Sequence, residues 1–436
     1  MSRAPALYRL AVRCARAAAP VLALGDTKLS RGIAGRRRAP ETLASWGAEA
    51  RDPGRPTVWF HAPSVGEGLQ AEAVIGALRA LRPDLQVAFT HFSPSAESLG
   101  ATMGADVSTY LPWDVAEPVA RVLDAMRPDL LAFTKTEVWP VLVEEAARRD
   151  VRVALVAGSV PPGAGRLRWP ARRLLRGTWS ALSLACASSD DDAAGLRRLG
   201  VRPEAVAVTG DPGIDAAVER AEAAAPDAPY LAPFHRDPRP TVVAGSTWQA
   251  DEAVLLPALG RLRRSMRRLR VLLAPHEPSR TRVAGLVDEL GRHGWSAVTL
   301  TDVESGQSLD GSNAVVVDQV GKLAHLYTVG TVAYVGGGFH RGGLHSVLEP
   351  AAARVPVVFG PRHHNARAAA ELLRAGGAKV APDEDGLARF LAGWLEDHSA
   401  RNDAGNRAFH YIGSHRGAAE RTASLLAAFL ESQRPT

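Results

Sequence analysis

Short β-branched runs alternate with longer helical stretches over most of this 436-residue chain. This alternation predicts βαβ units, which build parallel sheets covered by helices. The first series of runs consists of residues 57–62, 86–90, 107–111, 130–133, 152–156, 182–187 and 205–208. The second consists of residues 241–244, 270–273, 297–300, 314–317, 331–335, 356–359 and 378–380. Because this length exceeds one compact core, we expect an α/β protein of two Rossmann-like domains whose parallel sheets face a central cleft.

The composition between the two series predicts the domain boundary. Residues 216–239 are rich in alanine, proline and charge, and we interpret them as a linker. The expected first domain is then 51–215, preceded by a helical segment at 1–50. The expected second domain is 240–405. It is followed by a helical segment at 406–436 with no strand after it.

A glycine-rich turn follows the strand expected at 331–335. It begins with three consecutive glycines, Gly336, Gly337 and Gly338. Glycine has no Cβ, so a ligand can approach the backbone closely. A helix expected at 346–353 would direct free N–H groups and a positive dipole end at a phosphate, with Glu349 within reach of ribose hydroxyls. The turn could also serve tight packing alone, because neither the P-loop nor the dinucleotide fingerprint is complete.

Other strand ends in the second series carry groups that suit a phosphate. Ser246 follows one strand and offers an N–H and a hydroxyl. His276 and Arg280 follow the next strand, and both side chains are donors suited to phosphate oxygens. Ligands collect at the carboxyl ends of strands in sheets of this kind. We therefore expect a nucleotide-activated substrate at this edge.

Two carboxylates follow strands of the first series. Glu67 comes after Gly66 at the start of a helix, where it could be a general base or merely a partner of the helix dipole. Glu137 also follows a strand, with Trp139 nearby as a possible wall and Lys135 as a partner for Glu137 or for a phosphate. The alternative for this segment is an ordinary helix N-terminus.

The N-terminal segment has the pattern of a helix that lies on anionic lipid. On a helix over residues 5–24, Arg9, Arg13 and Arg16 form one basic stripe beside leucines, valine and many alanines, and Arg36–Arg38 add charge. The alternative is a helix docked on the protein with its arginines in solvent. No apolar run is long enough for a transmembrane helix.

The net charge of +6 comes from scattered arginines and only four lysines, so nucleic-acid binding does not follow from it. Cys14 and Cys186 are too few for a disulfide framework or a metal site, and we expect buried, inert thiols. The pairs and runs that hint at metal are His363-His364 and Asp190–Asp192, and neither has a convincing ligand spacing. We predict no metal.

Taken together, the motifs resemble the family of Kdo (3-deoxy-D-manno-octulosonic acid) transferases of lipopolysaccharide synthesis. The resemblance covers nearly the whole chain and preserves the order of the motifs. In the first half it rests on His61, Ser64-Val-Gly-Glu67, Tyr110-Leu-Pro-Trp-Asp114, Thr136-Glu-Val-Trp-Pro140 and Thr209-Gly210. In the second half it rests on Ser246-Thr247, Pro275, Pro278, Arg280, Leu326-Tyr327, Val335-Gly-Gly-Gly338, Gly342-Gly343, His345, Leu348-Glu349, Pro356 and Gly360-Pro361.

The resemblance implies a GT-B fold with an acceptor domain first and a CMP-Kdo domain second, and no metal or other cofactor. Glu67 matches the proposed catalytic base and Glu137 a second acidic residue. The positions expected around CMP are Ser246, His276, Arg280, the three glycines, His345 and Glu349. The last helix, 408–431, would cross back to the first domain.

The implied reaction is an inverting transfer of Kdo to a lipid A precursor of the lipid IVA type. The implied location is the cytoplasmic face of the inner membrane, with the N-terminal helix in peripheral or monotopic contact.

The chain departs from the family pattern at several positions. Lys135 and Lys322 stand where acidic residues are usual, and Gly210–Asp215 lacks a usual lysine. These departures leave two alternatives open. One is another GT-B enzyme, a UDP-dependent glycosyltransferase or a sugar-nucleotide epimerase. The other is an inactive nucleotide-binding paralogue.

Overall fold

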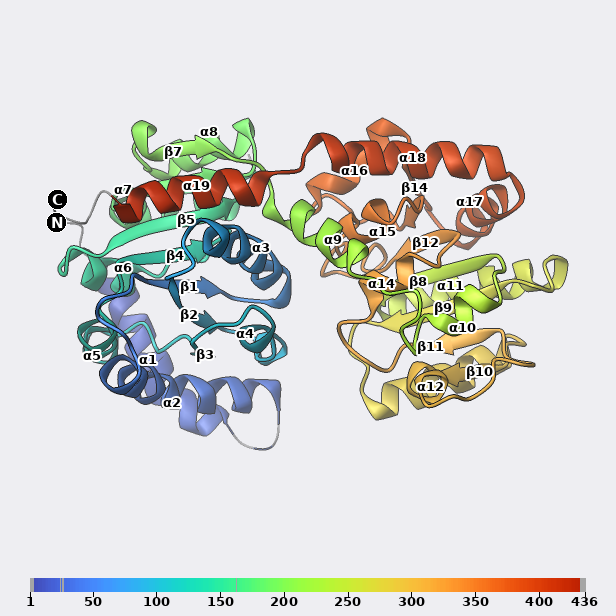
Figure 1. Ribbon diagram of the computed structural model, residues 1–436, viewed down its shortest axis with the longest axis horizontal. Helices are drawn as coiled ribbons and strands as arrows, with labels where there is room; N and C mark the ends of the chain where they lie inside the picture. Colours follow the sequence, from blue (N-terminus) through green and yellow to red (C-terminus); the bar gives the residue numbers. More distant parts are fainter. Residues whose placement is uncertain (1–3, 24, 26, 162, 432–436) are drawn as a thin grey trace. The chain divides into compact units, whose positions relative to one another are not determined.

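The chain folds into two compact units in a computed structural model that describes residues 4–23, 25, 27–161 and 163–431. Unit 1 comprises the chain up to Ala216 and again from Arg416, and unit 2 comprises Ala217–His415. Each unit contains one seven-stranded parallel sheet with helices on both faces (Figure 1). All fourteen expected strands are present, each within three residues of its predicted bounds. The α/β prediction is therefore confirmed.

The sheet of unit 1 has the strand order β3-β2-β1-β4-β5-β6-β7. Its strands are β1 Thr57–Ala62, β2 Gln86–His91, β3 Val107–Tyr110, β4 Leu130–Thr134, β5 Arg152–Gly158, β6 Leu184–Ala187 and β7 Val206–Val208. Its helices are α1 Ala6–Leu22, α2 Lys28–Glu49, α3 Val65–Leu81, η1 Pro94–Ala96, α4 Leu99–Thr102, α5 Ala116–Met126, α6 Pro140–Ala147, η2 Gly165–Leu167, α7 Ala171–Ser180, α8 Asp190–Leu199, η3 Pro203–Ala205 and α19 Ala418–Glu431. Helix α9, Pro212–Glu222, spans the boundary with unit 2.

Both faces of this sheet are buried, which explains why its strands are apolar without alternation. On β1, Trp59 packs into the core beneath α2, α5, α6, α7 and α8. The neighbouring Phe60 packs into the opposite core, beneath α3, α4 and α19. Successive side chains of a strand point to opposite faces, so a strand covered on both sides needs apolar residues throughout.

The sheet of unit 2 has the strand order β10-β11-β9-β8-β12-β13-β14. Its strands are β8 Thr241–Thr247, β9 Arg270–Pro275, β10 Ala297–Thr299, β11 Ala314–Val316, β12 Val332–Val335, β13 Val357–Phe359 and β14 Ala378–Val380. Its helices are α10 Ala232–Arg236, α11 Gln249–Ser265, α12 Arg280–Arg292, α13 Leu300–Glu304, α14 Leu323–Tyr327, α15 Leu348–Ala352, α16 Arg367–Ala375, α17 Glu384–Glu396 and α18 His398–Ser414.

The expected linker at 216–239 is folded. Helices α9 and α10 occupy much of it, and Tyr230, Leu231 and Phe234 are buried in the core of unit 2. The linker interpretation is wrong here because composition averaged over the segment hid three large apolar side chains among alanine, proline and charge. The unit boundary lies at Ala216/Ala217 instead.

The expected last helix is two helices, α18 in unit 2 and α19 in unit 1. Gly417 has a left-handed φ of 85°, which ends helical geometry between them. The Asp215 carboxylate accepts hydrogen bonds from the N–H groups of Gly417 (2.7 Å) and Ala419 (2.8 Å), at the start of α19. The chain thus returns to unit 1, where α19 packs against α3 (Figure 1). Residues 432–436 and 1–3 of the expected terminal segments lie outside the described residues.

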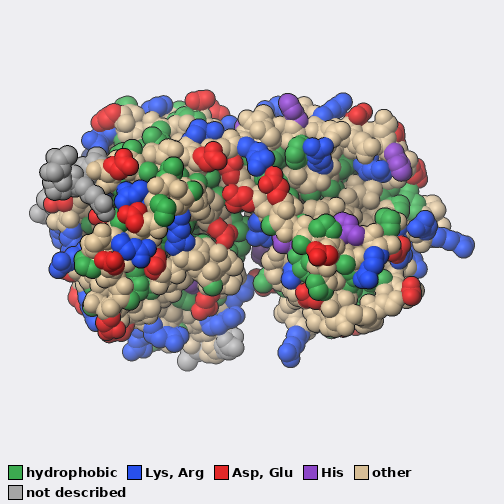
Figure 2. All heavy atoms as spheres, viewed as in Figure 1, with side chains coloured by type: hydrophobic (Ala, Val, Ile, Leu, Met, Phe, Trp, Pro, Cys, Tyr) green, Lys and Arg blue, Asp and Glu red, His purple; other side chains and the backbone are tan. Residues whose placement is uncertain are grey.

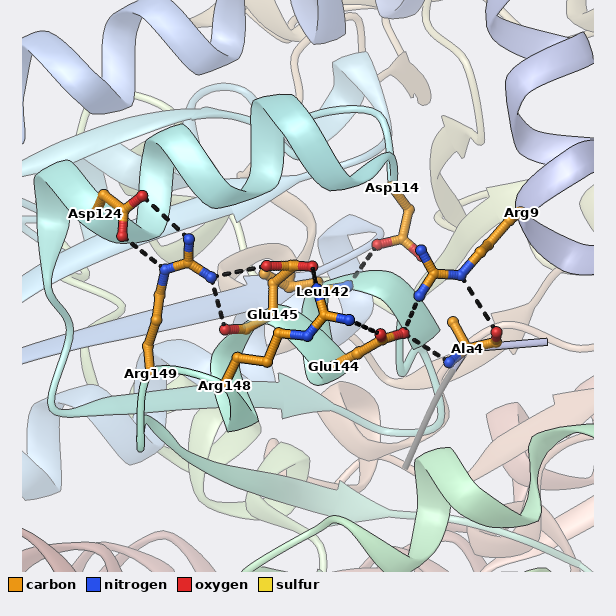
Figure 3. Close-up of polar contacts among 9 residues, drawn as sticks. All are labelled: Ala4, Arg9, Asp114, Asp124, Leu142, Glu144, Glu145, Arg148 and Arg149. Atoms are coloured by element: carbon orange, nitrogen blue, oxygen red, sulfur yellow. Dashed lines mark hydrogen bonds and ion pairs between the residues drawn. The ribbon is translucent and has the colours of Figure 1, made fainter. Parts of the chain in front are cut away.

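Helix α1 is fastened to unit 1 by the buried Glu144 carboxylate of α6 (Figure 3). Glu144 Oε2 accepts a hydrogen bond from Ala4 N at 2.7 Å and pairs with Arg9, and its other oxygen pairs with Arg148 at 2.6 Å. Tyr8 donates to Asp114 at 2.7 Å. Arg9 is therefore an internal partner rather than a free member of the basic stripe.

The outward side of α1 still carries exposed apolar residues, including Leu7 (68% exposed) and Val21 (72%). Leu24, the expected last residue of this helix, lies outside the described residues. Arg36 does not add charge for a membrane, because it is buried. Among the described residues, no helix combines the length and the apolar character that a membrane crossing requires.

Basic and acidic side chains are intermixed over the visible face of each unit (Figure 2). This agrees with the scattered arginines of the sequence. Cys186 is buried, and burial raises the pKa of its thiol to about 12, as expected of an inert cysteine. Cys14 is exposed on α1, so the expectation of burial is wrong for that residue.

Candidate active site

The strand order of unit 1 places its switch point between β1 and β4. The chain runs from β1 to β2 and β3 on one side, then returns to β4 on the other side of β1. Loops leaving neighbouring strands in opposite directions open a crevice at the carboxyl edge, where ligands of α/β proteins bind. Glu67 follows β1 and Glu137 follows β4, so both predicted carboxylates flank this switch point.

Glu67 lies in the first turn of α3, where the helix dipole favours a negative charge. The side chain is 15% exposed. Its Oε1 accepts a hydrogen bond from Lys135 Nζ at 3.0 Å, and its Oε2 accepts one from the Ser64 hydroxyl. Ser64 is the N-cap residue of α3, but its side chain does not cap the helix. The carboxylate is thus held in place and still reachable.

Lys135 adopts a left-handed backbone conformation with φ 65° directly after β4. A non-glycine residue is strained there. This conformation accompanies the contact between its ammonium and Glu67. The sequence left open whether Lys135 pairs with Glu137 or with a phosphate, and in the structure its partner is Glu67.

Glu137 is held by a different cation. Its Oε1 lies 3.0 Å from Arg166 Nη2, in the segment that follows β5, and the carboxylate is about one-third exposed. Among the described residues, no direct bond joins Glu137 to Glu67. Each carboxylate therefore has its own basic partner along the same sheet edge.

His61 is a buried hydrogen-bond relay beneath this edge. Trp139 Nε1–H donates to His61 Nε2 at 3.2 Å, so the ring proton resides on Nδ1 and is donated to the Thr90 carbonyl at 3.0 Å. Burial lowers the pKa of His61 to about 3, so the ring is neutral at physiological pH. The hydrogen bond to His61 therefore fixes the orientation of the Trp139 ring.

Arg36 packs beside Trp139 although it comes from the N-terminal helix α2. Its guanidinium donates to the Leu111 and Pro112 carbonyls at 3.1 and 3.2 Å. It lies 4.3 Å from the ring centre of Trp113 and 5.3 Å from that of Trp139. Burial lowers its pKa to about 10. Arg36, which was expected to add charge for a membrane, thus supports the candidate site from inside.

The switch point of unit 2 lies between β8 and β12. Ser246 near the end of β8 has φ 54°, at a register irregularity of that strand, and Gly336–Gly338 follow β12. A Cβ on Gly336 would overlap the Ser246 carbonyl, and one on Gly338 would overlap the backbone of Gly360. Close packing of loops therefore requires these glycines. Tight packing was the alternative to phosphate binding as an explanation of the glycine turn.

The buried Asp251 of α11 holds the glycine turn. Its carboxylate accepts hydrogen bonds from Gly337 N at 2.7 Å, Phe339 N at 3.1 Å and Trp248 N at 2.9 Å. It also accepts one from the Tyr334 hydroxyl at 3.0 Å. Gly337 N is thus occupied by the protein, and Gly336 N donates to the Gly245 carbonyl at 2.9 Å. The phosphate role of this turn stays a prediction.

An aromatic stack stands beside the turn. Trp248 lies between His340 and His276, with ring centres 4.2 and 4.5 Å away, and His276 stacks on His345 at 4.4 Å. Trp248 Nε1–H donates to His345 Nε2 at 2.9 Å. Burial, with a smaller contribution from His276, lowers the pKa of His345 to about 4. His345 is therefore neutral near pH 7 and presents an N–H rather than a positive charge.

The helix that carries Glu349, α15, is shorter than the expected 346–353, because it begins only at Leu348 and spans five residues. The short helix puts Glu349 in its first turn. The Glu349 carboxylate lies 3.4 Å from Arg220 Nε of α9. Burial raises the pKa of Glu349 and Arg220 opposes that rise. The ribose contact predicted for Glu349 would have to compete with this ion pair.

The remaining donor, Arg280, is exposed at the first position of α12. It makes no ion pair among the described residues, which leaves it available to an anion. No three His, Cys, Asp or Glu side chains gather as metal ligands in the described part of the chain.

Sequence reasoning assigned no role to Asp251, Trp248 or Arg220, and it placed Arg36 with the charge expected on a membrane. One signal was available for Asp251, since an acidic residue three positions after a helix N-cap is typical of a capping box. Arg220 was hidden by the linker interpretation, and Arg36 by the membrane interpretation. The partners of Arg36 and Arg220 lie 75 or more residues away in the sequence.

Two units, each with a seven-stranded parallel sheet covered by helices, fit the two-domain GT-B architecture. Solved structures of the same fold include UDP-GlcNAc 2-epimerase from Neisseria meningitidis bound to UDP-GlcNAc. That structure is 13% identical, with a TM-score of 0.59 over 86% of this chain and 100% of that chain. The S. aureus MnaA–UDP co-structure is 14% identical, with a TM-score of 0.61 over 87% of this chain and 99% of that one. At these identities the likeness concerns the fold.

Sequence comparison finds similarity to one family of enzymes. A family model described as 3-Deoxy-D-manno-octulosonic-acid transferase (kdotransferase) matches residues 36–216. The 3-deoxy-D-manno-octulosonic acid transferase of Haemophilus influenzae is 27% identical over 91% of this chain and 92% of its own length. The Bordetella pertussis enzyme of the same name is 28% identical over 96% and 98%. Residues 36–216 thus match the Kdo transferase family model, and most of the chain is similar to Kdo transferases.

Proposed function

We propose that this protein transfers Kdo from CMP-Kdo to a lipid A precursor of the lipid IVA type, with inversion at the anomeric carbon. The observation that carries the proposal is a held but accessible carboxylate, Glu67, at the switch point of a chain that aligns with Kdo transferases over nearly its whole length. The reaction needs a general base and a site for the CMP leaving group.

In the proposed reaction, Glu67 removes the proton from an acceptor hydroxyl as that oxygen bonds to the anomeric carbon. The bond from that carbon to the phosphate oxygen of CMP breaks, and its electron pair leaves with CMP. Arg280, the Ser246 hydroxyl and the N–H of His345 are the proposed donors to the leaving phosphate. The proposal requires no metal and no other cofactor.

Lys135 has a defined part in this scheme. Its ammonium donates a hydrogen bond to Glu67 and holds the carboxylate at one position. A cation at position 135, where an acidic residue is usual in the family, is therefore compatible with the proposed catalysis. The proposed acceptor is membrane-bound, at the cytoplasmic face of the inner membrane. The exposed apolar side of α1 supports peripheral or monotopic contact there.

The test measures transfer from CMP-Kdo to lipid IVA by mass spectrometry, with the parent protein, Glu67→Gln and Glu72→Gln. Glu72 lies on the same helix, so its variant is a matched control. Loss of a general base should lower the rate about 10²–10⁴-fold in Glu67→Gln only. Full activity of Glu67→Gln would show that another group is the base.

Two further measurements separate the alternatives. A thermal-shift series with CMP, UDP and GDP should show stabilisation by CMP, whereas preference for UDP would favour another GT-B sugar-nucleotide enzyme. Lys135→Glu restores the acidic residue that is usual in the family. If the parent is inactive and Lys135→Glu gains transfer activity, the protein is an inactive paralogue.

A further inference from the structure

Arginines line a cavity of about 700 Å³ on the surface of unit 1. The lining residues come from the segment around α7 and from the end of α8, and are Leu167, Trp169, Arg172, Arg173, Arg176, Arg197, Arg198 and Gly200. Helices α7 and α8 flank β6, near the edge of the sheet and away from the β1–β4 switch point. This cavity, called the α7–α8 pocket below, is therefore separate from the candidate active site.

The arginines of the α7–α8 pocket lack carboxylate partners among the described residues. None of its five arginines forms an ion pair in the described part of the chain, whereas Arg9, Arg148 and Arg149 of the same unit all pair with carboxylates. Residues 166–202 contain eight arginines and three aspartates, and the aspartates lie together in the first turn of α8. The acidic groups thus lie at one end of α8 and the pocket arginines at the other.

Two of the arginines occupy an electrostatically unfavourable place. Arg172 and Arg173 lie in the first turn of α7, which contains no acidic residue and no side-chain cap. The N-terminus of a helix carries partial positive charge, so cations there are destabilising. Arg176 lies one turn further on and repels both. A bound anion would relieve this repulsion, while simple solvation would leave it.

An apolar rim accompanies the charge. Trp169 is 80% exposed, and Leu174 of α7 is also exposed. Tryptophan with one wet and one apolar side is typical of membrane–water interfaces. Helix α6, which holds the start of α1, also contacts α7. The pocket and the exposed apolar side of α1 therefore share a neighbouring helix.

We propose that the α7–α8 pocket binds phosphate groups of acidic phospholipids in a bilayer, with Trp169 in the headgroup region. Guanidinium groups suit phosphate because they offer paired, planar N–H donors. An exposed tryptophan and leucine beside the charge favour a lipid source over a free phosphate. Membrane binding by an amphipathic helix strengthens with buried apolar area and with attraction to anionic lipids, so a second, basic contact adds to the binding by α1. The proposal does not depend on Kdo transfer.

The test is cosedimentation of the full chain with vesicles of phosphatidylcholine alone or mixed equally with phosphatidylglycerol. The pocket variant is Arg172→Gln/Arg173→Gln/Arg176→Gln. The control variant, Arg264→Gln/Arg267→Gln/Arg268→Gln, removes three exposed arginines at the end of α11. Since each arginine near an anionic surface contributes about fivefold, the pocket variant should bind about a hundredfold more weakly. The control should bind as the parent does.

A second measurement places Trp169. Phosphatidylglycerol with brominated chains should quench the emission of the parent more than that of Trp169→Phe. Equal quenching of the two, equal binding by the pocket variant and the parent, or equal loss in the control variant would each overturn the proposal. Complete inhibition of vesicle binding by an equal concentration of glycerol phosphate would also overturn it, because the pocket would then take a free anion.

Discussion

Replacement of Asp251 tests whether one buried carboxylate holds the glycine turn of unit 2 in place. The Asp251 side chain has no exposed surface and accepts four hydrogen bonds, two of them from the turn itself. Asp251→Ala removes all four acceptor contacts and leaves three backbone N–H groups without this partner, of which that of Gly337 is buried and those of Trp248 and Phe339 are half-buried. Hydrogen bonds to charged groups contribute about 1.5–3 kcal/mol each, and stranded donors add about 1–3 kcal/mol.

These contributions overlap, and water entering the vacated space offsets part of the loss. We therefore expect Asp251→Ala to lower the free energy of unfolding of unit 2 by about 4–6 kcal/mol, at the upper end of single substitutions. Asp251→Asn keeps one acceptor oxygen, so about half of that loss is expected. For a unit of this size, about 4 kcal/mol corresponds to a decrease in Tm of roughly 8–16 °C.

Urea unfolding measures the loss, and hydrogen exchange locates it. The amides of Gly337 and Phe339 should be protected in the parent and exchange rapidly in Asp251→Ala. Asp302→Ala is a matched control, because Asp302 accepts bonds from Thr299 only, in a small surface helix. It should lose about 1 kcal/mol. A loss below about 1 kcal/mol in Asp251→Ala, or unchanged exchange at Gly337, would refute the reasoning.

Two further predictions concern unit 1. Because burial lowers the pKa of His61 to about 3, the unfolded chain binds more protons than the folded one below about pH 6.5, so stability should fall as the pH falls. Urea titrations at several pH values measure this. Between pH 4 and 6 the free energy of unfolding should depend on pH less steeply in His61→Gln than in the parent, by about 1.4 kcal/mol per pH unit, and an unchanged slope would contradict the assignment. Glu144→Ala should cost about 1–3 kcal/mol and speed tryptic cleavage at Arg13 and Arg16, because it releases the start of α1. The control Glu41→Ala breaks only the exposed pair with Arg121 and should leave cleavage of α1 unchanged.

The sequence alone was enough to predict the fold and the edge of each sheet that carries the candidate sites. Strands buried on both faces are uniformly apolar, as Trp59 and Phe60 show, and such runs between helical patterns permit few architectures. Functional residues placed directly after strands must lie at the carboxyl edge of a parallel sheet. For that reason Glu67, Glu137, Ser246 and the glycine turn could be assigned to two edges before their contacts were known.

The partners of those residues depended on tertiary structure. Arg220 pairs with Glu349, which lies more than a hundred residues away in the sequence. Glu144 pairs with Arg9, which the sequence had assigned to the basic stripe of the N-terminal helix. Asp251 accepts hydrogen bonds from amides of the glycine turn, where the sequence had led us to expect a phosphate. The spacing of apolar residues along a segment indicates which face of the helix or strand is buried, because side chains repeat with the period of that element. It does not report which distant group satisfies a charge or an N–H, because that depends on how helices and loops pack together in space.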